Sequence, residues 1–244
     1  MTVLLLRLAA PLQSWGVDGR YSQRTTAQAP TKSGVVGLIA AAQGRRRSDP
    51  IEDLTRLRFG VRLDVPGTLL RDFHTASRGN ESLPTAEGKT RKPGEAVLTH
   101  RFYLEDAVFL AALESDFEFL TSLDEALRRP QYPLFLGRRA CPPTGPVTLG
   151  LRDGTIEEVF ASEPWSASPA LRSRTTDATL TIETIIDDPQ GTELVNDHPI
   201  TFDDRQRSWT QRIVTRSVVT VPHPEPRPER SAAPAHDPFA LLEP

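Results

Sequence analysis

Apolar and polar positions along the first half of the chain predict strands that alternate with two helices. Val3–Leu8 is a continuous apolar run of strand length, which is typical of a buried strand. In Thr31–Gln43 and Asp116–Leu127, apolar residues recur at spacings of three and four, which predicts two helices with one apolar face each. We therefore expect the first helix to follow the first strand, with a polar connection between them.

Three further segments have strand character. Phe59–Val65 alternates between apolar and polar residues, and Pro66-Gly67 predicts a turn that leads into a second strand, Thr68–Thr75. These two strands are expected to form a hairpin after the first helix. Arg101–Leu113 is another strand-like run, directly before the second helix. The order of these elements favours an α+β fold with a ferredoxin-like β-α-β-β-α-β core.

Other stretches lack a core pattern or follow the core. Ala76–Thr99 is polar, with glycines and prolines, and long segments of this kind are often functional. We expect a core over residues 1–150, which includes this segment. Residues 151–221 are predicted to form a small, β-rich C-terminal accessory region. Residues 222–244 are rich in proline and predict a flexible tail.

Charge is distributed unevenly along the chain. The 29 basic and 32 acidic residues give a net charge of −3, and only Lys32, Lys89 and Lys92 among the basic residues are lysines. Arginine suits bidentate phosphate contacts and stacking on bases, although a GC-rich genome would also favour it. Residues 1–50 are net basic, whereas residues 153–204 are strongly acidic. This polarity predicts one face for a polyanion and a separate face for other contacts.

Several classes of site find no support. The five histidines are scattered and no cysteine pair is present, so we expect neither a metal site nor a cofactor. Cys141 lies in a turn-like segment and is expected to be structural. The sequence holds no membrane-spanning stretch and no signal peptide, and its single cysteine favours the cytoplasm.

Basic clusters point instead to RNA. Around the first helix, arginines and Lys32 are interleaved with Trp15 and Tyr21, which could stack on bases. The N-terminus of that helix offers backbone N–H groups to a phosphate. Further clusters lie in the long polar segment and at Gly137-Arg138-Arg139. Three such clusters in the loops of a sheet fold favour RNA over a solvated surface.

Two alternatives remain open. RNA can be cleaved without a metal when a general base takes the 2′-hydroxyl proton, and His74 or His100 could serve as that base. In that case the protein is a metal-independent endoribonuclease that processes precursor RNA. Alternatively, it is a protein scaffold whose acidic block binds a basic partner.

Five motifs, in order over about residues 2–150, resemble the CasD family. The family's N-terminal pattern is similar to Leu6–Gly16, followed by Pro30–Gly34 with Val36-Gly37-Leu38. The remaining similarities are Asp72-Phe73-His74-Thr75, Arg101-Phe102-Tyr103-Leu104 with Asp106-Ala107, and Tyr132 followed by Pro133–Pro142. The resemblance weakens over residues 153–244, for which it implies little beyond a second-domain or accessory role.

This resemblance implies a non-catalytic subunit of the type I-E CRISPR surveillance complex, Cascade. Such a subunit holds the 5′ handle of the CRISPR RNA (crRNA), caps the CasC backbone and contacts the large subunit CasA, close to target DNA at the 5′ end of the guide. It also implies an RRM-like core with a long thumb hairpin, which corresponds by position to Ala76–Thr99. Recognition of target sequence would then be left to base pairing by the guide.

The candidate RNA-binding residues combine the basic clusters with the family motifs. They are Ser14, Trp15, Arg20, Tyr21, Arg24, Lys32, Ser33, Gly34, Arg45, Arg46, His74, Lys89, Arg91, Lys92, Arg101, Tyr132, Arg138 and Arg139.

Overall fold

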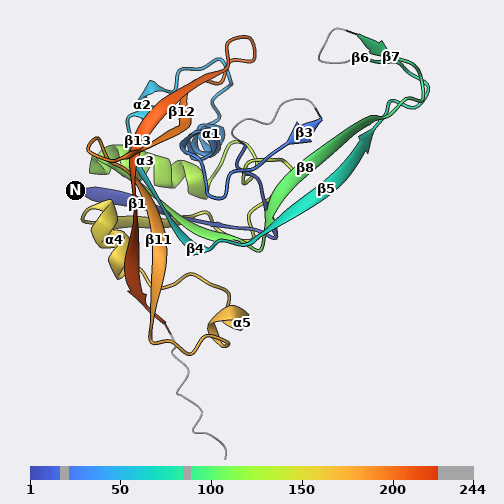
Figure 1. Cartoon of the computed structure of the whole chain (residues 1–244). Helices are drawn as coiled ribbons and strands as arrows, with labels where there is room; N and C mark the ends of the chain where they lie inside the picture. Colours follow the sequence, from blue (N-terminus) through green and yellow to red (C-terminus); the bar gives the residue numbers. More distant parts are fainter. Residues whose placement is uncertain (17–21, 85–88, 225–244) are drawn as a thin grey trace, which may run out of the picture.

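The computed structural model describes residues 1–16, 22–84 and 89–224, and its centre is a seven-stranded sheet in the order β10-β1-β9-β4-β11-β13-β12 (Figure 1). The apolar N-terminal run forms β1 (Thr2–Ala9), with four consecutive buried residues, because neighbouring strands and helices cover both of its faces. The other six strands of this sheet are β4 (Arg58–Val65), β9 (Val108–Ser115), β10 (Thr148–Asp153), β11 (Thr179–Asp187), β12 (Glu193–Thr201) and β13 (Ser208–Pro222).

Two longer helices cover one face of the sheet, and a short one covers the other. The longer helices are α1 (Lys32–Ala42) and α3 (Phe117–Arg128), capped by the side chains of Thr31 and Asp116. They pack on alternate β1 residues such as Leu4 and form the main core. Helix α4 (Ile156–Ser162) packs on the opposite face of β1 in a second apolar cluster. The remaining short helices are α2 (Glu52–Thr55) and α5 (Pro169–Arg172).

The order β1-α1-β4-β9-α3-β10 follows the expected alternation of strands and helices. Its four strands are neighbours in the order β10-β1-β9-β4, and every adjacent pair is antiparallel. Helices α1 and α3 pack on the same face of this four-stranded unit.

The expected hairpin between residues 59–65 and 68–75 is wrong. Strand β4 pairs with β9 and β11, whereas β5 (Thr68–Ala76) pairs with β8 (Val97–Glu105) in a second sheet. The chain changes sheet at Gly67, whose φ is 75° and where an added Cβ would lie 2.5 Å from the Glu105 carbonyl oxygen. The run expected as one strand over 101–113 is interrupted opposite this point by Asp106, with φ of 54°.

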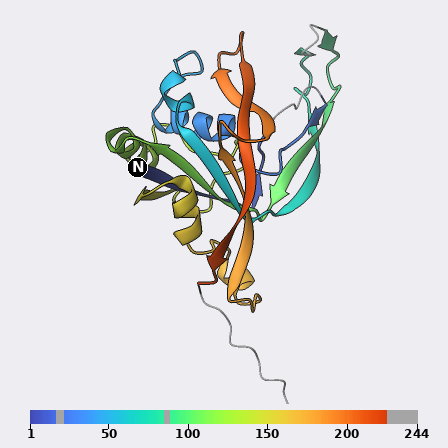
Figure 2. The ribbon, with the colours of Figure 1, turned by 60° about the vertical axis from the view of Figure 1, so that its left-hand side comes forward.

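These two bends turn one long antiparallel pair into a projecting hairpin. The register of β4 with β9 ends at Val65 and Val108, and the register of β5 with β8 resumes at Thr68 and Glu105. The described parts of the hairpin, residues 68–84 and 89–105, extend away from the large sheet in both views (Figures 1 and 2). Shorter strands complete this region: β2 (Leu12–Gln13) and β3 (Gln23–Arg24) pair with β8, and β6 (Leu83–Pro84) pairs with β7 (Thr90–Arg91).

The C-terminal strands continue the large sheet. Strand β11 pairs with β4 on one side and β13 on the other, and β12 is the edge strand. Residue 150 lies inside β10, and residues 179–222 add three strands to the sheet that contains β1. The predicted flexible tail begins at Pro222, and its residues 225–244 lie outside the described part of the chain.

Buried charges join the C-terminal strands to the start of α1. Asp197 in β12 accepts hydrogen bonds from the Lys32 backbone N (2.8 Å) and from Arg212 Nε (2.5 Å). Asp187 at the end of β11 pairs with Lys32 Nζ at 2.8 Å and with Arg212 Nη1 at 2.5 Å. This network fixes the position of β12 and β13 beside α1. Across the helices of the described ranges, none is long and apolar enough to cross a membrane.

Candidate nucleic-acid interface

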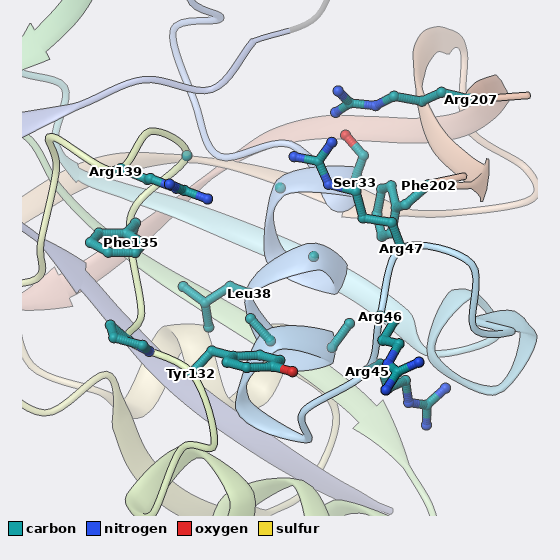
Figure 3. A pocket seen from close by; sticks show the side chains of 16 residues that line it. Ser33, Leu38, Arg45, Arg46, Arg47, Tyr132, Phe135, Arg139, Phe202 and Arg207 are labelled. Carbon is teal, nitrogen blue, oxygen red and sulfur yellow. The ribbon is translucent and has the colours of Figure 1, made fainter. Parts of the chain in front are cut away.

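A groove runs along the exposed side of α1 (Figure 3). It consists of two adjoining cavities of about 540 and 360 Å³, which share Ser33, Gly34, Gly137 and Arg207 in their linings. Small residues of α1, including Gly37, Ala40 and Ala41, line its floor. These residues leave room above the helix because their side chains are absent or short.

One wall of the groove is the segment 132–139, which is held against α1. The backbone N of Tyr132 donates to the Ala41 carbonyl at 3.3 Å, next to the end of the helix. Gly137 has φ of 90°, and an added Cβ would lie 1.7 Å from the Ser14 carbonyl oxygen, so only glycine fits this approach. Tyr132 is 48% exposed and lines the larger cavity together with Phe135 and Arg139.

The opposite wall comes from the end of β12 and the start of β13. Phe202 and Arg207 line the larger cavity, and Trp209 lines the smaller one. Phe202 also packs on the core beside Gly37. Figure 3 shows Arg207, Phe202 and Arg47 on one side of α1, and Tyr132, Phe135 and Arg139 on the other. The groove therefore has aromatic and cationic groups on both walls.

Arginines dominate the charge of this lining, and some of them are already paired. Arg45 forms a bidentate pair with Asp53, and Arg47 pairs with Asp204. The hydrogen bond to Asp53 raises the pKa of Arg45, and the same bond holds the pKa of Asp53 below its ordinary value. Within the described ranges, Arg46 and Arg139 form no ion pair. These two guanidinium groups are available to an anion without breaking a salt bridge.

Arg138 lines the smaller cavity, but its side chain has a structural role. It donates to the carbonyl oxygens of Phe102 (3.1 Å) and Arg24 (2.7 Å), and its guanidinium lies 4.7 Å from the centre of the Tyr103 ring. Arg138 also donates to the carbonyl oxygen of Thr25 at 3.3 Å. The guanidinium of Arg138 therefore holds the base of the hairpin and β3 together. Because these donors are already occupied, Arg139 is the better candidate for an RNA contact.

The structure corrects the expected role of Trp15. Its side chain is only 1% exposed, packs in the main core and donates from Nε1 to Gln13 Oε1 at 3.1 Å. An added Cβ at Gly34 would lie 2.7 Å from the Trp15 ring, so this glycine allows the helix to approach the tryptophan. Trp15 and Gly34 are thus packing residues, and the tryptophan is no stacking platform.

The N-terminus of α1 is not the free phosphate site that the sequence suggests. The Gly34 N–H donates to the Thr31 side chain, and the buried carboxylate of Asp197 accepts the Lys32 N–H. The Lys32 side chain is 5% exposed and its Nζ donates to Asp187 and to the Leu57 carbonyl, both at 2.8 Å. Protein oxygens already accept from these N–H groups, so the groups are not free for a phosphate. Lys32 is a buried structural cation.

The other candidate residues near the groove differ in whether they are buried or line a cavity. Ser14 is buried and donates from Oγ to the Phe102 carbonyl at 3.2 Å, which makes it structural. Ser33 lines both cavities, and the exposed Arg24 lines the smaller one. Arg20 and Tyr21 lie outside the described residues.

The remaining candidates lie on the projecting hairpin. His74 Nε2 pairs with Asp72 Oδ2 at 2.5 Å, and both side chains are 40% exposed. Arg101 lies opposite Asp72 in the register, and its Nε is buried with no hydrogen-bond partner in the described part of the molecule. Residues nearer the hairpin tip are exposed, namely Lys89, Arg91 and Lys92. The candidates therefore fall into two regions, the groove and the hairpin.

Sequence analysis missed part of the groove. It placed no candidate in or after the acidic block, yet Phe202, Arg207 and Trp209 form a wall. The available signal was an arginine two residues before a tryptophan, Arg207-Ser208-Trp209, at the start of a strand-like run. Among the described residues, no cluster of histidine, cysteine, aspartate or glutamate is arranged to hold a metal ion.

Comparisons with known proteins agree with this architecture. Residues 3–217 match the model of a family described as CRISPR-associated protein (Cas_Cas5). The CRISPR system Cascade subunit CasD of Escherichia coli (strain K12) is 37% identical over 161 residues, which cover 60% of this chain and 70% of that protein.

Two solved structures are also similar. A chain of a "CRISPR RNA-guided surveillance complex" has a TM-score of 0.75 and 33% identity, covering 90% of this chain and 91% of that chain. A chain described as "Crystal structure of Cas protein" has a TM-score of 0.66 and 33% identity, covering 88% of this chain and 94% of that chain.

Proposed function

Because this chain belongs to the CRISPR-associated Cas5 family, we propose that it is a non-catalytic, RNA-binding subunit of a Cascade-type surveillance complex. In this proposal the groove along α1 holds the 5′ handle of the crRNA. The core has the role of an RRM-like unit and the projecting hairpin that of the thumb that folds over the guide. The subunit would cap the CasC backbone and contact CasA, near target DNA at the guide 5′ end, in the cytoplasm.

The observation that carries this proposal is the composition and shape of the groove. A single RNA strand is recognised through unstacked bases that contact aromatic rings and guanidinium planes, with cations on the phosphates. The groove offers both on opposite walls, with Tyr132 and Arg139 on one side and Phe202 and Arg207 on the other. Since its floor is a packed helix, the backbone that carries these side chains is in place before RNA arrives, which lowers the entropic cost of binding.

Replacing Arg139 by alanine tests the proposal. We expect Arg139→Ala to weaken binding of repeat-derived, single-stranded RNA by roughly tenfold, because a charge-assisted contact to phosphate is lost. The salt dependence should fall by about 0.7 in slope, the value for one phosphate contact on a single strand. Arg174→Ala removes the same charge from an exposed residue that follows α5 and lines neither cavity. Equal binding by the two variants would refute the proposed site.

The Asp72–His74 pair supports a second candidate function. A carboxylate that orients an imidazole suits a general base for the RNA 2′-hydroxyl, and the two side chains are in contact and accessible to solvent. Incubation of the purified protein with repeat RNA in EDTA separates the candidates. The non-catalytic proposal expects intact RNA, whereas specific cleavage that disappears in His74→Ala would establish the endoribonuclease.

A further inference from the structure

The connection between β12 and β13 brings Arg207 to the groove, on the same side of α1 as Arg47. Arg207 contributes to the linings of both cavities, and its guanidinium lies 4.9 Å from the centre of the Trp209 ring. Arg47, from the loop after α1, lines the larger cavity on the same side of the helix (Figure 3). These cations come from segments that are 160 residues apart in the chain, and the fold brings them together.

Only one carboxylate of the described residues pairs with this arginine pair. Asp204 accepts a hydrogen bond from Arg47, and the two side chains are 69% and 67% exposed. An ion pair with this exposure contributes little to stability, about 0–1 kcal/mol, because water screens it. A stronger acceptor can therefore replace the Asp204 carboxylate at small cost.

The two arginines also repel each other. Burial lowers the pKa of Arg207, the neighbouring charge of Arg47 lowers it further, and only Asp204 acts in the opposite direction. Arg207 itself forms no ion pair within the described ranges. An additional anion between the two guanidinium groups would remove this repulsion.

We infer that Arg47 and Arg207 bind one backbone phosphate of a single RNA strand, and that Asp204 occupies part of that phosphate site in the free protein. Phosphate suits the site better than a carboxylate because its several oxygens can accept from both planar guanidinium groups at once. The rings of Phe202 and Trp209 line the same wall and offer surfaces to adjacent bases. The inference rests on the proposed RNA-binding function and adds the phosphate subsite and its internal competitor.

Removing Arg207 is the first test. The probe is a fluorescently labelled single-stranded RNA of about twelve nucleotides, titrated with the full chain. We expect Arg207→Ala to bind roughly tenfold more weakly, with a salt slope smaller by about 0.7. Arg205→Ala is the matched control, because Arg205 is an exposed arginine of the same turn that lines neither cavity. Equal affinities of the two variants would overturn the inference.

Removing Asp204 is the second test, and it distinguishes competition from a merely structural role. We expect Asp204→Asn to bind the same RNA more tightly, by up to about fivefold, because the phosphate no longer displaces a carboxylate. Asp153→Asn makes the same change in net charge at an exposed residue at the end of β10. This gain in affinity should disappear when Arg47 is also replaced by alanine, since the Arg47–Asp204 ion pair that competes with the phosphate is then absent in either case. If Asp204→Asn and Asp153→Asn bind alike, the inference is wrong.

Failure of this inference differs from failure of the proposed function. If wild-type protein does not bind the RNA, the proposed function fails, and if Arg139→Ala binds as tightly as wild type, the Arg139 side of the proposed site is refuted. If Arg139→Ala weakens binding but Arg207→Ala does not, the groove binds RNA and only the Arg47–Arg207 subsite is refuted. Thermal melting of each variant, with an unchanged midpoint expected for these exposed side chains, excludes unfolding as the cause.

Discussion

The groove and the projecting hairpin both carry basic residues, but the two regions differ in what supports those residues. The groove is built on α1, whose opposite side is buried in the main core. The hairpin is a narrow β-structure, and large apolar side chains such as Phe73 and Leu98 remain 56% and 52% exposed on it. The comparison shows that packing, and not the number of cations, separates a preformed site from a surface that must be ordered by its partner.

The same difference separates structural cations from candidate RNA contacts. Lys32 and Arg138 have their donors occupied by protein oxygens, whereas Arg46 and Arg139 lie exposed without an ion pair in the part of the chain that the structure describes. Substitutions at the first two residues should therefore affect stability, and substitutions at the second two should affect RNA binding.

The largest expected effect is on stability, from Lys32→Ala. This change removes a buried ammonium group from Asp187, which among the described residues keeps Arg212 as its cationic partner. We expect the free energy of unfolding to fall by about 3 kcal/mol, the lower end of the range for breaking a buried ion pair. Urea unfolding measures the change, with Arg46→Ala as the control expected to unfold like wild type. A stable Lys32→Ala protein with weakened RNA binding would show that Lys32 is a ligand contact after all.

The next effect is at the junction of the two regions. Arg138→Ala should lower the free energy of unfolding by about 2 kcal/mol, because three carbonyl oxygens lose a charged donor. Arg139→Ala, at the adjacent exposed position, should leave it unchanged. The midpoints of thermal unfolding compare the two neighbours directly. Equal midpoints combined with weaker RNA binding by the Arg138 variant would mean that Arg138 is no structural link.

Much of the fold could be predicted from the sequence because its elements follow local patterns. The helical spacing over Thr31–Gln43 and Asp116–Leu127 corresponds to α1 and α3, and the apolar run Val3–Leu8 lies within β1. The pairing of β5 could not be predicted in the same way. Pro66-Gly67 does form a turn, but a turn signal does not say whether the chain returns along the preceding strand or enters another sheet. That choice depends on the distant break at Asp106.

Site residues could be predicted from the sequence where residue type alone determines their role, but not where burial determines it. Arg139, Tyr132 and Arg46 were identified from sequence and do line the groove. Trp15 was misassigned, since a tryptophan among arginines looks the same in sequence whether it is exposed or packed under a helix. Phe202 and Arg207 were missed because it is the pairing of β12 with β13, and of β13 with β11, that brings the connection between β12 and β13 to α1.

The third prediction concerns the hairpin itself. Alanine at both Arg91 and Lys92 should weaken binding of the same single-stranded RNA by about two- to threefold, less than Arg139→Ala alone. Both residues are exposed near the hairpin tip, and binding there must first restrict mobile side chains. Fluorescence titration at one salt concentration compares the variants. A loss larger than that of Arg139→Ala would reverse the ranking of the two regions.

The smallest effect is a pH dependence of stability that arises from His198 in β12, next to the buried charges beside α1. Burial lowers the pKa of His198 in β12 below its ordinary value of 6.5, and the charge of Lys32 lowers it further. Arg212 acts in the same direction, whereas Asp187 and Asp197 oppose it.

Because the folded chain holds His198 neutral, the unfolded chain takes up its proton first as the pH falls. The contribution of His198 to stability is therefore complete above pH 6.5 and decreases as the pH falls from 6.5 towards the lowered pKa of the folded state. His198→Gln should remove this part of the pH dependence, while His74→Gln on the hairpin should keep it. Urea midpoints at about pH 7.5 and about pH 5.5 measure the difference for each variant. If the two variants lose stability equally on acidification, the buried charges beside α1 do not control the protonation of His198 in β12. The contrast between the packed groove and the exposed hairpin then does not extend to the pH dependence of stability.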